Sequence, residues 1–450
     1  MRLDEPPPPS SLDIRSPSPI PVRYRPIDNY CCKSSTSYNL KMIRRYVNLV
    51  VANRSTRTYS LHRLDVAKYL FYPSTAEAEA ANAANKNSNG SVKPSRIGRL
   101  RRLPPASMCF RKLSPPKEHD PSRWFPDDMF TLLSPGSRSS EGRILHISEQ
   151  GPAVVYDADT RSTSTVPSLH GSWGGNLPIF IPIAGDGEER NRLYMIHKSF
   201  VEPSFQVLDL NQHRLKWEAL PPAPPFTFST AEEYCRFDGR DCRIVSVTVV
   251  DRGQTICVST DRKGTFCFDT RSRKWWQACH WALPFDGRPV YVPELDTWIG
   301  LSTWSASAGR GHLLCASSDL SAMKKHQAPT LQHIWEDLTL PKEQETVVLN
   351  RRFVGAVVHR SREWVLENHH LINLGGGRFC LAKVFTERRR VSVGIGYDVH
   401  DEEHGPFVVL TGVEVLPGGD DDDNGEAGLR MVKHKSKRYM STENEIKWVL

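Results

Sequence analysis

Short apolar runs alternate with polar turns along most of the chain, and residues 255–285 show this pattern most clearly. They read TICVSTDRKGTFCFDTRSRKWWQACHWALPF. Short runs of β-branched and aromatic residues, separated by Asp, Gly and Ser, are typical of strands joined by tight turns. The stretch therefore predicts three consecutive strands. Residues 244–250 predict a fourth strand, which precedes them across the turn Asp251-Arg252-Gly253.

Weaker copies of this unit recur on both sides of it. They are expected at residues 46–73, 129–167, 192–222, 290–341 and 353–434. Each copy tends to combine an apolar strand that ends in Asp, a polar turn, a Trp or Val, and a Leu-Pro closure. The strand-ending aspartates are Asp157, Asp209, Asp269 and Asp319, at spacings of 52, 60 and 50 residues. Their carboxylates are expected to accept hydrogen bonds from N–H groups of the turns.

This period favours a kelch-type propeller, since kelch blades repeat at about 50 residues and WD40 blades at about 40 to 45. Each sheet of a propeller is covered on both faces, so its strands can be apolar on both sides. Phe266-Cys267-Phe268 has this character. The prediction is an all-β, kelch-like β-propeller of about six four-stranded blades. The apolar end of the chain, residues 446–450, is expected to pair near the first blade and close the propeller.

The composition of the chain changes at a few places and predicts its organisation. Residues 1–41 are rich in Pro and Ser without periodicity, which predicts a disordered extension before a propeller domain at 42–450. Residues 74–102, rich in Ala, Asn, Ser and Lys, predict a disordered surface insertion, and 417–427 an acidic, Gly-rich hairpin loop. Ala76–Ala84 is the one part of the insertion with a helical pattern.

Charge and targeting signals limit the class of protein. The net charge of +8 comes from residues 1–120, which hold 21 Lys/Arg against 9 Asp/Glu. A solvated basic segment is the favoured interpretation over a nucleic-acid-binding tail. No apolar run has the length of a membrane span, and the first residues lack the apolar core of a signal peptide. A cytoplasmic or nuclear protein that is not secreted is expected, with reduced and mostly buried cysteines.

Several segments of the chain resemble the plant domain of unknown function 1668 family, which is abundant in grasses. They are MIRRYVNLVV, TYSLHRLDVAKYLFYPSTAEAE, FCFDT, WALPFDGRPVYVPELDTWIGLS, LGGGRFCLAKVF, VVLTGVEV and LRMVKHKSKRY. The resemblance covers roughly residues 42–450 and implies a kelch-type propeller without an established activity, cofactor or catalytic residue. Residues 1–41 depart from the family pattern, which makes Met42 an alternative start of the chain.

Three short strings match known sites, and each has a simpler interpretation. His400–His404 reads HDEEH, a zinc-protease string that requires a helix, but its neighbours predict a charged surface loop. Asp420–Gly425 begins like an EF-hand loop, yet Met431 stands where the bidentate Glu belongs, so a solvated hairpin tip is favoured. Gly375–Gly377 lacks the Lys-Ser/Thr of a phosphate loop and predicts a turn with positive φ.

Other residues carry weaker signals. Two basic segments, 99–102 and 433–438, are alternatives for a nuclear import signal, although the second is expected on a strand. Tryptophans are expected to pack between blades before they bind a ligand; they are Trp275, Trp276, Trp281, Trp298 and Trp304. One histidine occurs in each of several units, and a metal site would require them to converge; they are His146, His197, His280 and His312.

The prediction for function is a non-enzymatic scaffold or adaptor that binds partner proteins through loops on one face of the propeller. No catalytic residue, metal ligand or cofactor site is predicted, and neither membrane nor nucleic acid is expected as a partner. The protein is expected to be monomeric. The alternatives are a propeller enzyme, either a metal-dependent oxidase or a sugar-processing enzyme, and a nucleic-acid binder that uses the basic N-terminal quarter.

Overall fold

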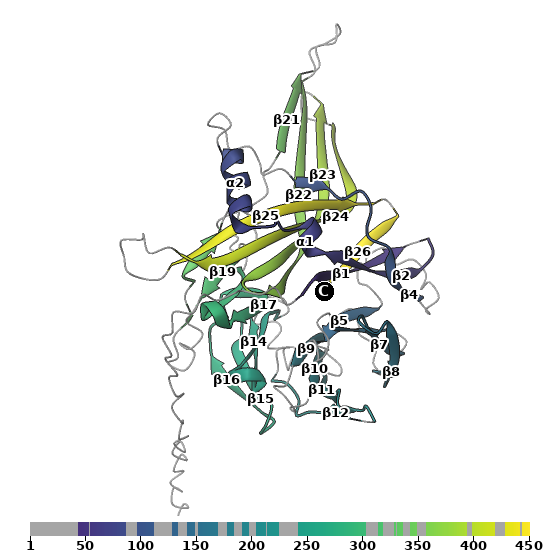
Figure 1. Ribbon diagram of the computed structural model, residues 1–450, viewed down its shortest axis with the longest axis vertical. Helices are drawn as coiled ribbons and strands as arrows, with labels where there is room; N and C mark the ends of the chain where they lie inside the picture. Colours follow the sequence, from purple (N-terminus) through teal and green to yellow (C-terminus); the bar gives the residue numbers. More distant parts are fainter. Residues whose placement is uncertain are drawn as a thin grey trace, which may run out of the picture. The chain divides into compact units, whose positions relative to one another are not determined.

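Nearly all the regular structure in the computed structural model is β-strand (Figure 1). The structure describes residues 44–53, 55–86, 97–111, 128–133, 142–148, 152–169, 178–183, 191–197, 204–212, 214–224, 242–302, 314–317, 328–329, 331–335, 343–348, 357–393, 398–418, 428–441 and 443–450. The helical elements are α1 (Val66–Tyr69), α2 (Thr75–Lys86) and the 3-10 turns η1 (Asp251–Gly253) and η2 (Pro293–Leu295). None of these has the length and apolar character needed to cross a membrane.

The strands form four-stranded units, numbered here 1 to 6 in chain order. Unit 1 has the spatial order β26 (Asn444–Val449), β1 (Tyr46–Asn53), β2 (Thr58–Asp65) and β4 (Ala106–Arg111). Unit 2 consists of β5 (Met129–Leu133), β6 (Arg143–Ile147), β7 (Ala153–Asp157) and β8 (Ser162–Val166). Unit 3 consists of β9 (Ile179–Ile183), β10 (Arg192–His197), β11 (Ser204–Asp209) and β12 (Trp217–Ala219).

Units 4 and 5 share one eight-stranded sheet, in which a parallel bridge between Ser246 and Gly287 joins them. Unit 4 consists of β13 (Ile244–Val250), β14 (Thr255–Thr260), β15 (Gly264–Asp269) and β16 (Lys274–Cys279). Unit 5 consists of β17 (Phe285–Val292), β18 (Thr297–Ser302), β19 (Leu314–Ser317) and β20 (His333–Trp335).

Unit 6 contains the longest strands, and two short strands extend its sheet. It consists of β22 (Val357–Gly375), β23 (Arg378–Val393), β24 (Asp398–Pro417) and β25 (Leu429–Met440). β21 (Glu343–Val348) lies at one edge and β3 (Ile97–Arg99) at the other. The adjacent strands β22, β23 and β24 can be followed in Figure 1.

The end of the chain pairs with its first strand, as the sequence predicts. β26 runs antiparallel to β1, with Leu49 opposite Val449 and Val50 opposite Trp448. The backbones of Asn48 and Leu450 exchange hydrogen bonds of 2.9 Å in both directions. Unit 1 is therefore built from both ends of the described chain, and its edge is paired.

Among the described residues, hydrophobic clusters join neighbouring units 1 and 2, 2 and 3, 3 and 4, and 5 and 6, and one more joins the sixth unit to the first. Units 4 and 5 are joined through their shared sheet. Successive side chains of a strand point to opposite faces of its sheet. Ile144 therefore packs against unit 1, whereas Leu145, the next residue, packs against unit 3. The clusters join Tyr59 with Phe130, Leu145 with Phe180, Phe205 with Phe268, Val292 with Phe379, and Leu64 with Ala382. Four-stranded units joined in a closed cycle, through clusters on their faces or through a shared sheet, form a six-bladed β-propeller, as predicted, and they are called blades below.

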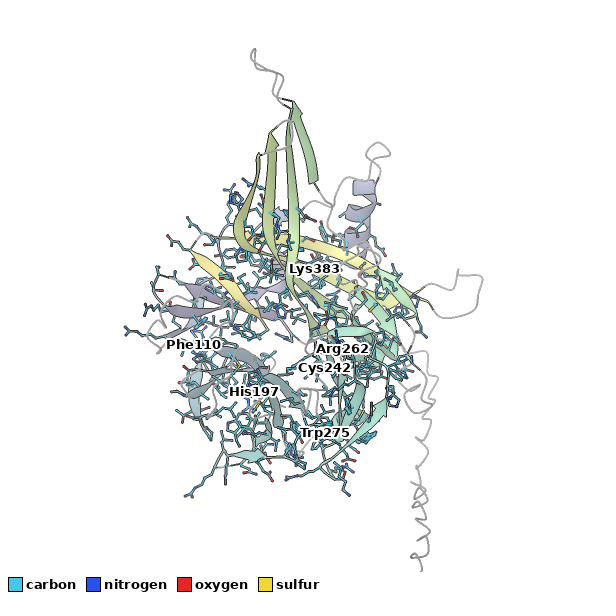
Figure 2. All side chains as sticks on the ribbon, turned by 180° about the vertical axis from the view of Figure 1, so that it is seen from behind. Phe110, His197, Cys242, Arg262, Trp275 and Lys383 are labelled. Carbon is cyan, nitrogen blue, oxygen red and sulfur yellow. The ribbon has the colours of Figure 1, made fainter. Side chains whose placement is uncertain are left out.

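Trp275 packs between two blades as expected. Trp275 (Figure 2) lies 5.1 Å from a phenylalanine ring of blade 3 and 5.0 Å from one of blade 4, between ring centroids. Trp281, in the connection between blades 4 and 5, and Trp298 of blade 5 pack against a small cluster formed by Leu283, Phe285 and Cys315. Trp276 is 45% exposed and differs from them. Trp304 lies outside the described residues.

The strand-ending aspartates fix turns, which confirms their predicted role in three blades. The Asp157 carboxylate accepts hydrogen bonds from two turn N–H groups at 3.0 Å, and Asp269 accepts two at 2.7 and 2.9 Å. Asp209 accepts one at 3.1 Å. Asp319 lies outside the described residues. These turns connect the third strand of a blade to its fourth.

The insertion at 74–102 differs from the prediction of disorder. Thr75–Lys86 forms α2, and residues 97–99 form β3, while 87–96 lie outside the described residues. The helix is held by contacts to blade 6, because Ala78 is fully buried and the Asn82 amide donates to the Lys433 carbonyl oxygen at 2.8 Å. The predicted extension 1–41 also lies outside the described residues.

Candidate functional site

The insertion connects the first blade to the last and places a basic segment between them. It leaves blade 1 after β2, crosses to blade 6, and returns to blade 1 as β4. On blade 6, β3 pairs in parallel with β25, with Arg99 opposite Arg438. The N–H group of Leu100 then donates to the carbonyl oxygen of Arg438 at 2.8 Å. This pairing fixes the path of the basic segment 99–102 beside the junction of the two blades.

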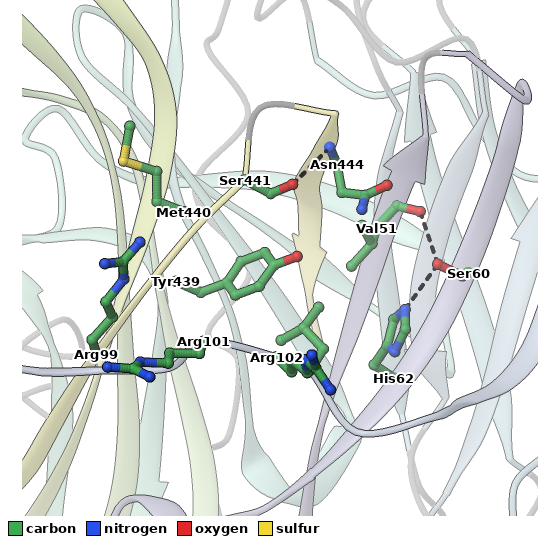
Figure 3. A pocket seen from close by; sticks show the side chains of 11 residues that line it. Val51, Ser60, His62, Arg99, Arg101, Arg102, Tyr439, Met440, Ser441 and Asn444 are labelled. Carbon is green, nitrogen blue, oxygen red and sulfur yellow. Dashed lines mark hydrogen bonds between the residues drawn. The ribbon is translucent and has the colours of Figure 1, made fainter.

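A cavity of about 730 Å³ opens at this junction, and it is called the basic pocket here. Its charged and polar wall includes Arg99, Arg101, Arg102, His62, Tyr439 and Asn444. Its apolar part is formed by Val51, Leu103 and Met440. Figure 3 shows the pocket from close by, with the ring of Tyr439 directed towards the middle of the group. The walls come from β1 and β2 of blade 1, β25 of blade 6, β26 and the insertion.

The arginines of the pocket lack the acidic partners that several other arginines of the described structure have. Arg378 pairs with Glu414 at 2.8 Å, and Arg388 pairs with Glu403 at 3.1 Å. In contrast, the three pocket arginines are exposed and form no ion pair within the described residues. The described lining also contains no carboxylate. The pocket therefore carries an excess of positive charge suited to an anionic ligand.

Two polar residues of the pocket bond to each other. The hydroxyl oxygen of Ser60 lies 2.8 Å from Nε2 of His62, and Nδ1 of His62 lies 2.6 Å from the carbonyl oxygen of Pro104. Because that carbonyl can only accept, Nδ1 carries a proton and donates it. In the neutral ring, Nε2 is an acceptor for the Ser60 hydroxyl, whose other acceptor is the carbonyl oxygen of Val51 at 3.5 Å. A hydroxyl, an imidazole and an orienting acceptor thus lie in sequence.

A buried charged cluster holds the insertion on blade 6. The carboxylate of Glu414 is 3% exposed and accepts hydrogen bonds from Arg378 and Thr75, both at 2.8 Å, and from His434 at 3.2 Å. Burial alone would raise the pKa of this carboxyl. Hydrogen bonds from His434, Arg378 and Thr75 outweigh it and lower the pKa of Glu414 to about 2. Nδ1 of His434 accepts from the N–H group of Tyr72 at 3.2 Å, so Nε2 is the nitrogen that donates to Glu414.

The histidines considered for a metal site do not converge in the described structure. His146 is buried, bonds to Asp128 at 2.9 Å and stacks on Phe130. His197 is buried in blade 3, whereas His280 is exposed in blade 4. No group of three or more His, Cys, Asp or Glu among the described residues is arranged to hold a metal ion. His312 lies outside them.

The short strings have mixed outcomes. His400–His404 belongs to β24 and pairs with β23, so the predicted loop is wrong; the helix of a zinc protease is also absent from this segment. Gly375–Gly377 confirms its prediction, with φ of 83°, 61° and 67°. Lys433–Arg438 lies on β25, as expected. Asp420–Gly425 lies outside the described residues, although the flanking Pro417 and Leu429 pair as a hairpin requires.

Comparisons with known proteins identify the family. The profile described as Protein of unknown function (DUF1668) matches residues 44–439. The chain belongs to this family. No curated protein matches the chain.

Three solved structures are similar at low sequence identity. The β-propeller domain of Cps50 (Swd1) from Myceliophteria thermophila has a TM-score of 0.34 and 9% identity, with 81% of this chain and 93% of that chain covered. Kuenenia stuttgartiensis hydrazine synthase has a TM-score of 0.28 and 9% identity, covering 60% and 73%. A protein from Lactobacillus plantarum has a TM-score of 0.23 and 10% identity, covering 70% and 100%. The fold therefore rests on the strand pairing and blade interfaces above.

Proposed function

We propose that the protein is a non-enzymatic interaction module that takes up an acidic segment of a partner protein in the basic pocket. The observation that carries this proposal is the group of three arginines around a cavity whose described lining holds no carboxylate. Guanidinium groups bind carboxylates and phosphates through paired hydrogen bonds, which gives geometric selectivity as well as attraction. The loops first expected to bind partners lie largely outside the described residues, so the pocket is the supporting feature.

The kelch-like character of the blades is part of this proposal. It is supported by the repeated turn that follows the third strand in blades 2, 3 and 4, where Asp157, Asp209 and Asp269 accept hydrogen bonds from turn N–H groups. Their spacings of 52 and 60 residues lie nearer to the kelch period of about 50 than to the WD40 period. We also propose that the protein acts as a monomer, which analytical ultracentrifugation would measure directly.

The test uses short fluorescein-labelled peptides of opposite charge and the full chain. A peptide with one short Asp/Glu cluster between uncharged residues is expected to bind with an affinity that falls as salt rises, and a peptide with Lys in place of the Asp and Glu is not. The double substitution Arg101→Gln and Arg102→Gln should weaken binding of the acidic peptide about tenfold or more, because a charge-assisted hydrogen bond is worth roughly 1.5–3 kcal/mol. Arg271→Gln, at an exposed turn of blade 4, is the matched control. Equal binding by all three proteins would refute the proposal.

Hydrolysis is a second candidate function, favoured by one observation. Ser60, His62 and the Pro104 carbonyl oxygen are arranged as a nucleophile, a base and an orienting group, at 2.8 and 2.6 Å. A neutral carbonyl stabilises a charged imidazole less than the carboxylate of a serine hydrolase does. Labelling by a fluorophosphonate probe that is lost in Ser60→Ala and retained in Ser107→Ala would support this activity. Absence of labelling in the parent protein would count against it.

A further inference from the structure

The basic pocket is rich in hydrogen-bond donors. The amide oxygen of Asn444 accepts from the side-chain amide of Asn53 at 2.7 Å, which fixes the orientation of the Asn444 amide. Its NH₂ group supplies donors for a ligand. The Ser441 hydroxyl oxygen accepts from the backbone N–H of Asn444 at 3.2 Å, which leaves its hydrogen to donate. The Tyr439 ring is buried, and its hydroxyl faces the pocket (Figure 3).

We propose that the anion taken up by the basic pocket is a phosphorylated side chain of a peptide segment. This inference rests on the proposed function, because both concern the same pocket. Three guanidinium groups and three neutral donors surround the cavity from several directions. A phosphoryl group presents three acceptor oxygens in a tetrahedral arrangement and carries close to two negative charges at neutral pH. A carboxylate has two oxygens in one plane and a single charge, so it satisfies fewer of these donors.

The acidic residues next to the pocket favour a single phosphoryl group over an extended polyanion. Glu443 is exposed in the turn that carries Ser441 and Asn444, and Glu445 follows on β26. Both line a small cavity that shares Ser441 and Asn444 with the basic pocket. A nucleic acid or an anionic membrane surface would place further negative charges close to these carboxylates. A peptide can present one phosphate and an uncharged or basic residue beside it.

The volume of the basic pocket leaves room for more than a free phosphate ion. The volume of about 730 Å³ exceeds the space that one phosphoryl group fills. Met440, which is 38% exposed, and half-buried Leu103 supply apolar contact area. Neighbouring residues of a peptide would cover this area, which adds affinity that an inorganic ion cannot gain.

The experiment compares three peptide libraries on the full chain by fluorescence anisotropy. The libraries share randomised flanks and differ at the central position, which is phosphoserine, glutamate or serine. We expect the phosphoserine library to bind about tenfold more tightly than the glutamate library, and the serine library to bind least. Equal affinity for phosphoserine and glutamate would overturn this inference and leave the proposed function standing. Absence of binding by both would overturn the two together.

Variants and competitors locate the site and identify the source of the phosphate. Tyr439→Phe removes one donor and keeps the buried ring, so binding of the phosphoserine library should fall several-fold with the melting temperature retained. Arg101→Gln with Arg102→Gln should reduce it about tenfold or more, whereas Arg271→Gln should not change it. Binding of an RNA oligomer or of vesicles with phosphoinositide, combined with no preference for the phosphoserine library, would refute a peptide ligand.

Discussion

The substitution Glu414→Gln tests the buried cluster that attaches the insertion to blade 6. One carboxylate oxygen accepts from Arg378, and the other accepts from both Thr75 and His434. A glutamine can keep only one of these oxygens, and its NH₂ group would face a donor at the other position. The substitution therefore removes a charge and leaves at least one buried donor without an acceptor.

The pKa of Glu414 sets the expected size and pH dependence of the effect. Its value of about 2 in the folded protein, against an ordinary value of 4.5, corresponds to roughly 3 kcal/mol, at 1.36 kcal/mol for each pKa unit. A depressed pKa stabilises the folded state above the unfolded pKa, and the contribution is lost as the pH falls towards the folded value. The contribution of Glu414 should thus be complete at pH 7 and fall to about 1.4 kcal/mol at pH 3.

Urea unfolding of the parent protein and Glu414→Gln between pH 7 and pH 3 measures this difference. The control is Glu403→Gln, since Glu403 forms an exposed pair with Arg388 whose loss should cost less than about 1 kcal/mol. Hydrogen exchange of α2 should also increase in Glu414→Gln, because Thr75 begins that helix. A stability difference that is near zero at pH 7, or constant down to pH 3, would refute the reasoning.

Three further predictions address closure, a tight turn and thiol reactivity. Val449→Ala should lower the free energy of unfolding by about 2 kcal/mol, because Val449 is buried in the cluster between blades 1 and 6; a melting temperature equal to the parent's would contradict this. Gly264→Ala should cost about 2 kcal/mol or more in urea unfolding, since its φ is +84° and a β-carbon would overlap backbone atoms, whereas Gly405→Ala meets open space and should cost less. Iodoacetamide should label exposed Cys109 well before Cys380, whose pKa burial raises to about 12; equal rates in mass spectrometry would disprove the assigned burial.

The blade architecture could be predicted because the signal for it lies in residues that are next to each other in the sequence. A strand covered on both faces must be apolar at neighbouring positions, as Ile144 and Leu145 are. β9 lies before the unit expected at residues 192–222, and its Pro182 is a residue that normally argues against a strand. β9 is an edge strand of its sheet, where a missing N–H group is tolerated.

The insertion shows where a local reading of the sequence fails. Thr75–Lys86 is rich in Ala, Asn and Glu, a composition that cannot form a core by itself. Its order depends on Glu414 and the Lys433 carbonyl oxygen, which lie more than 300 positions away along the chain. Local composition contains no information about partners at that separation. The sequence shows the arginines at 99–102 as a basic segment. The other residues of the pocket come close to them only because the last strands of the chain pair with β1 and β3.

The insertion and the last strand hold the same junction in different ways, and this explains where the pocket lies. β26 pairs with β1 and completes blade 1, while β3 pairs with β25 and ties the insertion from blade 1 to blade 6. The pocket is lined by residues of both connections, including Asn444 of β26 and Arg99 of β3. A ligand that contacts both can bind only when the propeller is closed. Ligand binding must then stabilise the closed propeller by the free energy of binding. The stability of the fold therefore depends on whether the basic pocket is occupied.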